Sequence, residues 1–219
     1  MTDIKWHQEE KPQMRVNTRE GVTYLTYPEF DKLPGFVHAF STRLGGVSEG
    51  IYSSMNLSFT RGDKEEAVKE NYKRMADAAG FDMNDIVTSD QTHTANVRLV
   101  TEKDRGNGIT KPRPYTDVDG MITNVPGLVL ATFYADCVPL YFIDPVHRAI
   151  GLSHSGWRGT VAKIGAVTVR RMQEEFGSEP SEIYAAVGPS ICQDCYEVSE
   201  DVIEQFKENF AEEQWDSLF

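Results

Sequence analysis

Cysteine is scarce in this chain of 219 residues, which has three, and basic residues are outnumbered by acidic ones, 22 against 34. Three cysteines do not build the disulfide framework of a small secreted protein, and an odd number fits a reducing compartment better. The formal net charge of −12 repels a phosphate backbone, so a nucleic-acid partner is not expected. A small anionic substrate can still bind at a local basic pocket.

Signals for export or membrane insertion are also missing. The N-terminal MTDIKWHQEE has neither the basic start nor the apolar centre of a signal peptide. The one long apolar run, Pro126 to Ile143, is interrupted by Asp136 and Pro139, which indicates two buried strands rather than a membrane span. We therefore expect a cytoplasmic protein without a membrane partner.

The periodicity of the chain predicts a mixed α/β or α+β domain. No repeat, low-complexity tract or long linker divides the sequence, so we expect one domain over residues 1–219. Strand composition occurs at Gly21–Tyr27, at Phe36–Ser41 and in short runs between Ile86 and Ile150. Apolar residues at helical spacing predict three helices: from an Asp63 cap to Gly80, over Thr160–Phe176, and over Ser199–Phe210.

The stretch AIGLSHSGWRGT, residues 149–160, reads as a strand that turns into a helix. His154 lies where the strand ends, and Arg158 shares the turn with free backbone N–H groups at the helix start, which together can hold an anion. The plain alternative is that Trp157 packs in the core and Arg158 pairs with a surface carboxylate.

Two other places carry polar residues in unusual surroundings. His93 lies in the polar loop of SDQTHTANVRL, and Asp136-Cys137 interrupts the apolar run TFYADCVPLYF. A buried carboxylate or thiolate needs hydrogen bonds, a cation or a metal. Taken singly, each residue also has an ordinary structural explanation.

Six motifs, taken in order, resemble the laccase-domain family, also called the multicopper polyphenol oxidase family. They are FSTRLGGVSEGIYSSMNL, SDQTHTANV, DVDGMIT, YADCVPLYF, LSHSGWRGTVAKIG and VGPSICQDCYEVS, and they span about residues 36–210. The resemblance implies a four-layer α/β/β/α fold with mixed β-sheets. It also implies a purine nucleoside phosphorylase with adenosine deaminase activity that depends on zinc. Family members usually continue beyond the position of Phe219, so we expect this chain to lack a C-terminal segment.

The resemblance also implies a metal site formed by His93, Cys137 and His154. Two imidazoles and one thiolate suit tetrahedral zinc, and three protein ligands leave a fourth position for water or substrate. Zinc lowers the pKa of a bound water to about 7, which would supply hydroxide for attack on C6 of adenosine.

Copper is the rival metal, because two His and one Cys are also a copper-binding pattern. A multicopper oxidase needs further His-rich copper sites, and the other histidines, His7, His38 and His147, are scattered. The zinc deaminase signature His-x-Glu with Pro-Cys-x-x-Cys is absent as well. Cys192 and Cys195 form a single C-x-x-C, which we interpret as two partly buried thiols.

The remaining candidates are polar residues of the same motifs. Arg43 and Arg158 are expected to bind phosphate or ribose, and Asn56 to hold the nucleoside or to cap a turn. Gln91 and Asp136 flank metal ligands, where they would orient those ligands, handle a proton or form a structural hydrogen bond. Asp117 and Asp119 of the DVDG motif are expected to shape a tight turn.

We therefore expect zinc as the cofactor, with copper as the alternative, and a purine nucleoside and inorganic phosphate as the substrates. Adenosine, inosine and methylthioadenosine are the candidate nucleosides. Three other functions stay open: a copper-dependent polyphenol oxidase, a hydrolase with Cys137 as nucleophile and His154 as base, and a protein that binds a nucleoside or metal without catalysis.

Overall fold

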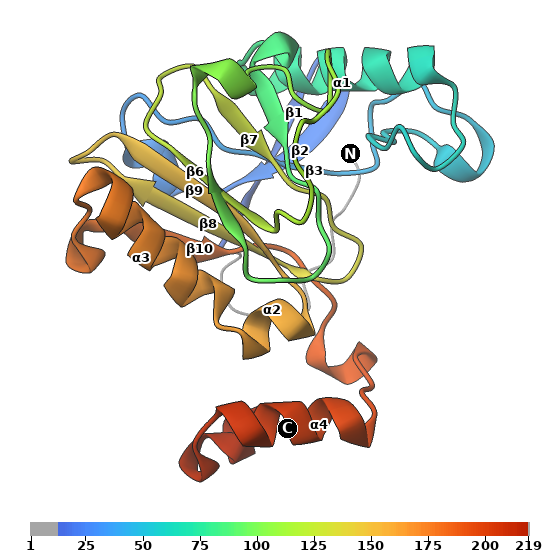
Figure 1. The fold of residues 1–219 in the computed structure, drawn as a ribbon. Coiled ribbons are helices and arrows are strands. Elements are labelled where there is room, and N and C mark those ends of the chain that lie inside the picture. The colour runs from blue at the N-terminus through green and yellow to red at the C-terminus, as the bar shows by residue number, and fades with distance from the viewer. Residues whose placement is uncertain (1–12, 219) are drawn as a thin grey trace. The chain divides into compact units, whose positions relative to one another are not determined.

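The computed structural model describes residues 13–218, which form two compact units that divide between Met83 and Asn84. Each unit is described separately. Over the described residues, no helix combines the length and apolar character needed to cross a bilayer. The expected combination of helices with mixed β-sheets is confirmed (Figure 1).

The first unit pairs a small antiparallel sheet with one long helix. Its strands β1 (Arg15–Arg19), β2 (Val22–Thr26) and β3 (Phe40–Ser41) lie in that order. The helix α1 (Glu65–Ala79) packs Met75 and Ala78 against Val22 and Met55. Two 3-10 turns, Phe30–Lys32 and Gly50–Tyr52, lie in the connections. The strand expected at Phe36–Ser41 is thus confined to its last two residues, and β1 was not foreseen.

The start of α1 differs from the expected cap at Asp63. Lys64 occupies the N-cap position and no side chain caps it. The Asp63 carboxylate instead accepts hydrogen bonds from Ser48 Oγ at 2.6 Å and Asn56 Nδ2 at 2.9 Å. The end agrees with the sequence, because Gly80 closes the helix with a φ of 89°, a conformation that glycine adopts without a Cβ penalty.

The second unit is built on a mixed five-stranded sheet. In spatial order its strands are β10 (Tyr184–Val187), β8 (Val138–Asp144), β9 (Ala149–Ser155), β6 (Gly120–Thr123) and β5 (Val97–Leu99). Only β5 and β6 run parallel, and the other neighbours are antiparallel. A parallel pair, β4 (Ile86–Thr88) and β7 (Val129–Ala131), forms a separate small sheet. As expected, Asp136 lies between two strands rather than within a membrane span.

The five-stranded sheet has an apolar core on each face, because successive residues of a strand point to opposite sides. Met121 packs with Val87 and Leu130 of the small sheet. Ile122 packs with Met172 of helix α3 (Ile164–Phe176), which lies along the other face (Figure 1).

Five further 3-10 turns lie in the described residues: Met83–Asp85, Glu102–Asp104, Pro180–Glu182, Gln193–Cys195 and Glu212–Ser217.

The helix expected over Thr160–Phe176 is divided into two. A short helix α2 (Trp157–Val161) ends at Ala162, and α3 follows Lys163, whose φ of 58° lies in the left-handed region and breaks the helix. The last helix, α4 (Glu200–Asn209), agrees closely with the sequence pattern, although only Val202 of its apolar residues is buried.

The turn between β8 and β9 is held by a fully buried carboxylate, and this generates a test of stability. Asp144 accepts hydrogen bonds from the backbone N–H groups of Val146 (2.9 Å) and His147 (3.0 Å) and contacts His147 Nδ1 at 2.8 Å. Asp144→Ala leaves these groups unpaired, so we expect the free energy of unfolding in urea to fall by about 2–4 kcal/mol. The exposed Glu182 supplies the control, because Glu182→Ala should change stability by less than about 0.5 kcal/mol.

Candidate metal centre

Three side chains of the second unit that are far apart in sequence meet at one edge of its large sheet. His93 lies in the connection from β4 to β5, Cys137 directly precedes β8, and His154 lies in β9. One ligand atom from each lies within 4.8 Å of the other two. The convergence expected from the sequence is therefore present.

Strand register explains why these residues meet. In the antiparallel pair of β8 and β9, Val138 lies opposite Ser155, so the chain just before β8 reaches the end of β9. On the other side of β9, Gly120 lies opposite Ser153, and the residue before β6 is Asp119. Adjacent strands of the sheet thus deliver Cys137, His154 and Asp119 to the same edge.

Gly156 allows the cluster to be this compact. A Cβ atom on Gly156 would lie 2.8 Å from His93 Cδ2 and 3.1 Å from Cys137 Sγ, closer than carbon and sulfur atoms pack. The His93 and His154 rings meet edge to face, with centroids 4.9 Å apart. The glycine of the HSGWRG motif is therefore a steric requirement of this cluster.

Asp119 organises both histidines, although the sequence suggested only a turn. Its carboxylate is fully buried and lies 2.8 Å from His154 Nδ1. It also accepts the backbone N–H groups of Thr92 (3.0 Å), His93 (3.0 Å) and Thr94 (2.9 Å). Burial opposes ionisation, but these hydrogen bonds outweigh it and hold the pKa of Asp119 far below its usual range.

The contact to Asp119 fixes which nitrogen of His154 is available. With Nδ1 hydrogen-bonded to the carboxylate, Nε2 is the nitrogen left to face a ligand. The same carboxylate fixes the loop at His93. The φ of His93, 67°, lies in the sparsely populated left-handed region, and the hydrogen bond from its N–H to Asp119 holds it there. One carboxylate therefore positions two of the three side chains.

Asp117 supports the same loop from the solvent side. Its carboxylate accepts hydrogen bonds from the hydroxyls of Thr92 and Thr94 and from Asn96 Nδ2. The side chain is exposed, so these bonds compete with water. Asp117 thus stabilises the His93 loop without contacting either imidazole.

The donor set of this cluster fits a divalent metal such as zinc. Burial raises the pKa of the Cys137 thiol, and the carboxylates of Asp136 and Asp119 raise it further. A bound cation would reverse this effect and favour the thiolate. Two imidazoles, one sulfur and a carboxylate that orients a ligand histidine are the usual components of a protein zinc site.

Gln91 and Asp136, which flank the cluster in sequence, have different surroundings. Gln91 links two loops, because its Nε2 donates to the Phe133 carbonyl at 2.6 Å and its Oε1 accepts the Phe133 N–H at 2.7 Å. Both ends of its amide are thus engaged with the backbone. Asp136 is exposed in the bend before β8, so the expectation that its carboxylate is buried is wrong.

Arg158 lies exposed on α2, near the cluster in sequence. Its guanidinium carbon is 4.1 Å from the centre of the Trp157 ring, a cation–π contact. Its charge also contributes to lowering the pKa of Asp201 on α4, although the largest cause there is the Ser199 hydroxyl. Trp157 is half-buried, so the guanidinium of Arg158 stacks on a partly exposed ring.

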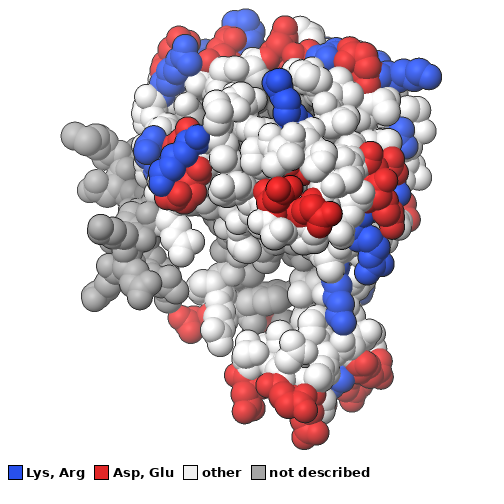
Figure 2. Space-filling model, turned by 90° about the vertical axis from the view of Figure 1, so that its left-hand side faces the viewer, with Lys and Arg blue, Asp and Glu red and all other residues white. Residues whose placement is uncertain are grey.

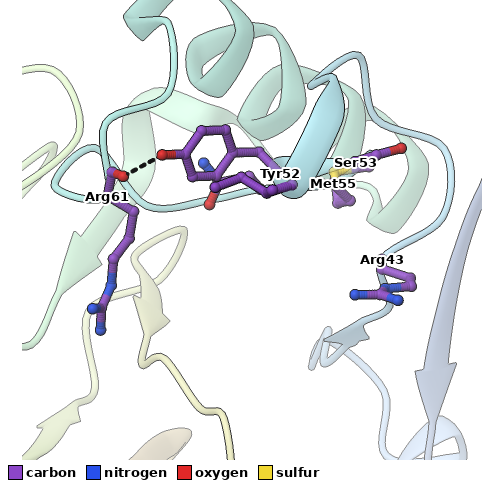
Figure 3. Close-up of a pocket in the computed structure, with 7 residues that line it drawn as sticks. Arg43, Tyr52, Ser53, Met55 and Arg61 are labelled. Carbon is purple, nitrogen blue, oxygen red and sulfur yellow. Dashed lines mark hydrogen bonds between the residues drawn. The ribbon is translucent and has the colours of Figure 1, made fainter.

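A separate hollow of about 460 Å³ in the first unit contains the other two candidates, Arg43 and Asn56 (Figure 3). Arg61, which sequence reasoning missed, also lines it, and Tyr52 donates a hydrogen bond to the Arg61 carbonyl at 2.6 Å. Within residues 13–83, no carboxylate pairs with the guanidinium of Arg43 or Arg61. That these two arginines lie at one hollow was not recognisable from their spacing in the sequence.

Asn56 has the turn-forming role that was one of its two interpretations. Its Oδ1 accepts the Ser58 N–H at 3.1 Å, and its Nδ2 donates to Asp63 at 2.9 Å. The Asn56 carbonyl accepts a hydrogen bond from Asn71 Nδ2 at 2.8 Å. The side chain of Asn71 is fully buried and also binds Val47 and Ser48, so it holds the loops that line the hollow.

The role of Asp119 can be tested against a neighbour on the same turn. Asp119→Asn replaces one of the two acceptor oxygens by an NH2 donor and removes the charge that orients His154, so we expect zinc affinity to fall by about 10- to 100-fold. Asp117→Asn, on the solvent side, should change it less than about threefold. Competition with a chromophoric chelator measures both variants, and equal losses would refute the positioning role.

Comparison with known proteins identifies the family. Residues 37–218 match the family described as multi-copper polyphenol oxidoreductase laccase. Purine nucleoside phosphorylase YlmD of Bacillus subtilis is 41% identical over 169 residues, which are 77% of this chain and 61% of that protein. Adenosine deaminase RL5, from an unknown prokaryotic organism, is 38% identical over 181 residues, 82% of this chain and 69% of that protein.

A solved structure agrees with these sequence matches. The crystal structure of YlmD from Geobacillus stearothermophilus has a TM-score of 0.83 at 34% identity, covering 92% of this chain and 73% of that chain. The present chain spans about three fifths of the length of the Bacillus subtilis relative. On these matches, the chain belongs to the multi-copper polyphenol oxidoreductase laccase family.

Proposed function

We propose that this chain carries a zinc-dependent purine nucleoside phosphorylase activity together with adenosine deaminase activity. The observation that carries the proposal is the cluster of His93, Cys137 and His154, whose ligand atoms lie within 4.8 Å of one another. The names of relatives about 40% identical to the chain, purine nucleoside phosphorylase and adenosine deaminase, support the same reactions.

His93, Cys137 and His154 would hold the zinc ion. These three ligands would leave a position for water or a substrate atom, and bound zinc would supply Lewis-acid chemistry there. Asp119 orients His154 through Nδ1 and holds the His93 loop through three backbone N–H groups. Gln91 keeps the Phe133 loop in place.

Phosphate and the nucleoside need groups that recognise an anion and a sugar. Arg158 offers an exposed guanidinium that Trp157 restrains by stacking, and arginine binds phosphate oxygens through two parallel N–H donors. Arg43 offers a second guanidinium, at the hollow of the first unit. We assign phosphate or ribose binding to these two arginines. Asn56 is proposed to hold the nucleoside through the turn that it forms with Ser58 and Asp63. Asp136, exposed beside Cys137, is assigned to proton handling.

The substrates of this proposal are inorganic phosphate and adenosine, inosine or methylthioadenosine, and the location is the cytoplasm. Figure 2 shows basic and acidic side chains interspersed over one face, with acidic ones gathered at the end formed by α4. A small anion held by individual arginines is compatible with this surface, because its binding needs only a local positive charge.

Two other functions are favoured by specific observations. The description of the matching family names a copper-dependent oxidation of polyphenols, and a His₂Cys set also binds copper. The contact of Asp119 with His154, beside Cys137, also has the connectivity of a Cys-His-Asp triad. Oxidation of a phenol that depends on added copper would support the first alternative. The second would be supported if the metal-free protein has hydrolase activity and loses it when Cys137 is alkylated.

The thiolate assignment can be tested by comparing the three cysteines. We expect Cys137→Ala to lower zinc content and activity together, because it removes one of three ligands. Cys192→Ala and Cys195→Ala should leave both near wild type. Metal analysis of protein purified without added metal decides this, and loss of zinc in Cys192→Ala would contradict the proposed ligand set.

The reaction itself is tested by product analysis. With adenosine and phosphate we expect adenine and ribose 1-phosphate, and without phosphate we expect slow formation of inosine. Arg158→Ala should raise KM for phosphate by about tenfold and affect deamination less, because deamination involves no phosphate dianion. Arg170→Ala, exposed on α3, is the control and should change KM by less than about twofold.

A zinc-loaded preparation gives the decisive comparison for this proposal. If this preparation binds a purine nucleoside tightly but releases neither free base nor inosine from any purine nucleoside tested, the protein is a binding protein without catalysis. Chromatography of the reaction mixture detects both products separately.

A further inference from the structure

The proposed reaction does not use Cys192 and Cys195, and their surroundings differ from the expected pair of partly buried thiols. Cys195 is exposed and Cys192 is half-buried, and neither is in a disulfide. They lie at the two ends of one 3-10 turn, Gln193–Cys195, in which the Cys195 N–H donates to the Cys192 carbonyl at 3.1 Å. The neighbouring Cys192 thiol raises the pKa of Cys195.

The hydrogen bond of this turn limits the separation of the two cysteines. A turn closed by a hydrogen bond between residues i and i+3 keeps their Cα atoms within about 7 Å. A disulfide spans Cα atoms about 4.4–6.8 Å apart. A bond between these two sulfurs therefore needs side-chain rotation and little movement of the backbone.

The turn is also attached to the loop that carries Cys137. Directly before the turn, the Ile191 N–H donates to the Asp136 carbonyl at 3.0 Å. Three residues earlier, the Gly188 N–H donates to the Pro139 carbonyl at 2.8 Å. The backbone that leads into the thiol pair thus contacts the bend at residues 135–137.

We propose that Cys192 and Cys195 are a reversible dithiol–disulfide site, and that the disulfide restrains the segment that contacts the Asp136–Cys137 loop. The oxidant is a small-molecule disulfide such as oxidised glutathione. One protein thiolate attacks a sulfur of that disulfide and releases one glutathione thiolate. The second protein thiolate then attacks the mixed disulfide and releases the other. The protein loses two electrons and two protons, and the oxidant becomes two thiols.

The first test equilibrates the zinc-loaded protein with mixtures of reduced and oxidised glutathione, followed by alkylation and peptide mass spectrometry. We expect Cys192 and Cys195 to become resistant to alkylation together. The peptide that holds both should be lighter by two hydrogens than its reduced form, and reduced glutathione should reverse the change. Cys192→Ala and Cys195→Ala should give only a glutathione adduct on the remaining thiol of the pair. The site would be overturned if Cys192 and Cys195 stayed open to alkylation in every glutathione mixture that oxidises the urea-unfolded protein. A disulfide from either of them to Cys137 or to a second chain would overturn it as well.

The second test measures the restraint without using enzymatic activity or bound metal. Hydrogen–deuterium exchange of the Ile191 amide, which donates to Asp136, should slow several-fold in the disulfide form, because the closed ring limits local opening. Cys192→Ala exposed to the same oxidant should show no slowing. Equal exchange rates in oxidised and reduced wild-type protein would refute the restraint, whatever the outcome of the activity assays.

Discussion

The hydrogen bonds of Asp119 are the interaction on which the candidate site depends. A fully buried carboxylate is costly unless hydrogen bonds compensate it, and Asp119 obtains them from His154 and from three consecutive backbone N–H groups at Thr92–Thr94. Those partners belong to two elements, the β4–β5 loop and strand β9. The energetic need of one charge therefore fixes both histidines relative to each other.

The sheet supplies the position of that carboxylate. Because β9 lies between β8 and β6 and runs antiparallel to both, the end of β9 meets the starts of its two neighbours. Cys137 and Asp119 are the residues just before those starts, on either side of His154. Gly156 then removes the side chain that would collide with His93 and Cys137. The site is thus a consequence of strand register rather than of proximity in the chain.

The sequence predicted the helices and strands of the fold well where periodicity was regular, and less well where single side chains decided the outcome. The end of α1 at Gly80 followed from local signals, but Asp63 gave up the cap position to bind Ser48 and Asn56 across the loop. The break falls on Lys163, a residue type that gives no signal for a left-handed conformation. Convergence of His93, Cys137 and His154 was foreseen through family resemblance, because spacings of 44 and 17 residues do not specify a contact. Asp119 was missed because DVDG also reads as an ordinary turn.

Charge balance connects the site to its proposed cofactor. Asp119 is ionised, since its hydrogen bonds hold its pKa far below the usual range despite burial, and the same negative charge helps to raise the pKa of Cys137. Without a cation, Asp119 therefore contributes a negative charge to the cluster, and the raised pKa of Cys137 favours its thiol form. A divalent ion that binds there would displace the thiol proton, and its two positive charges would balance one carboxylate and one thiolate while both imidazoles stay neutral. A neutral site of this kind avoids the cost of a net charge at an edge of the sheet where Asp119 and His154 are both buried.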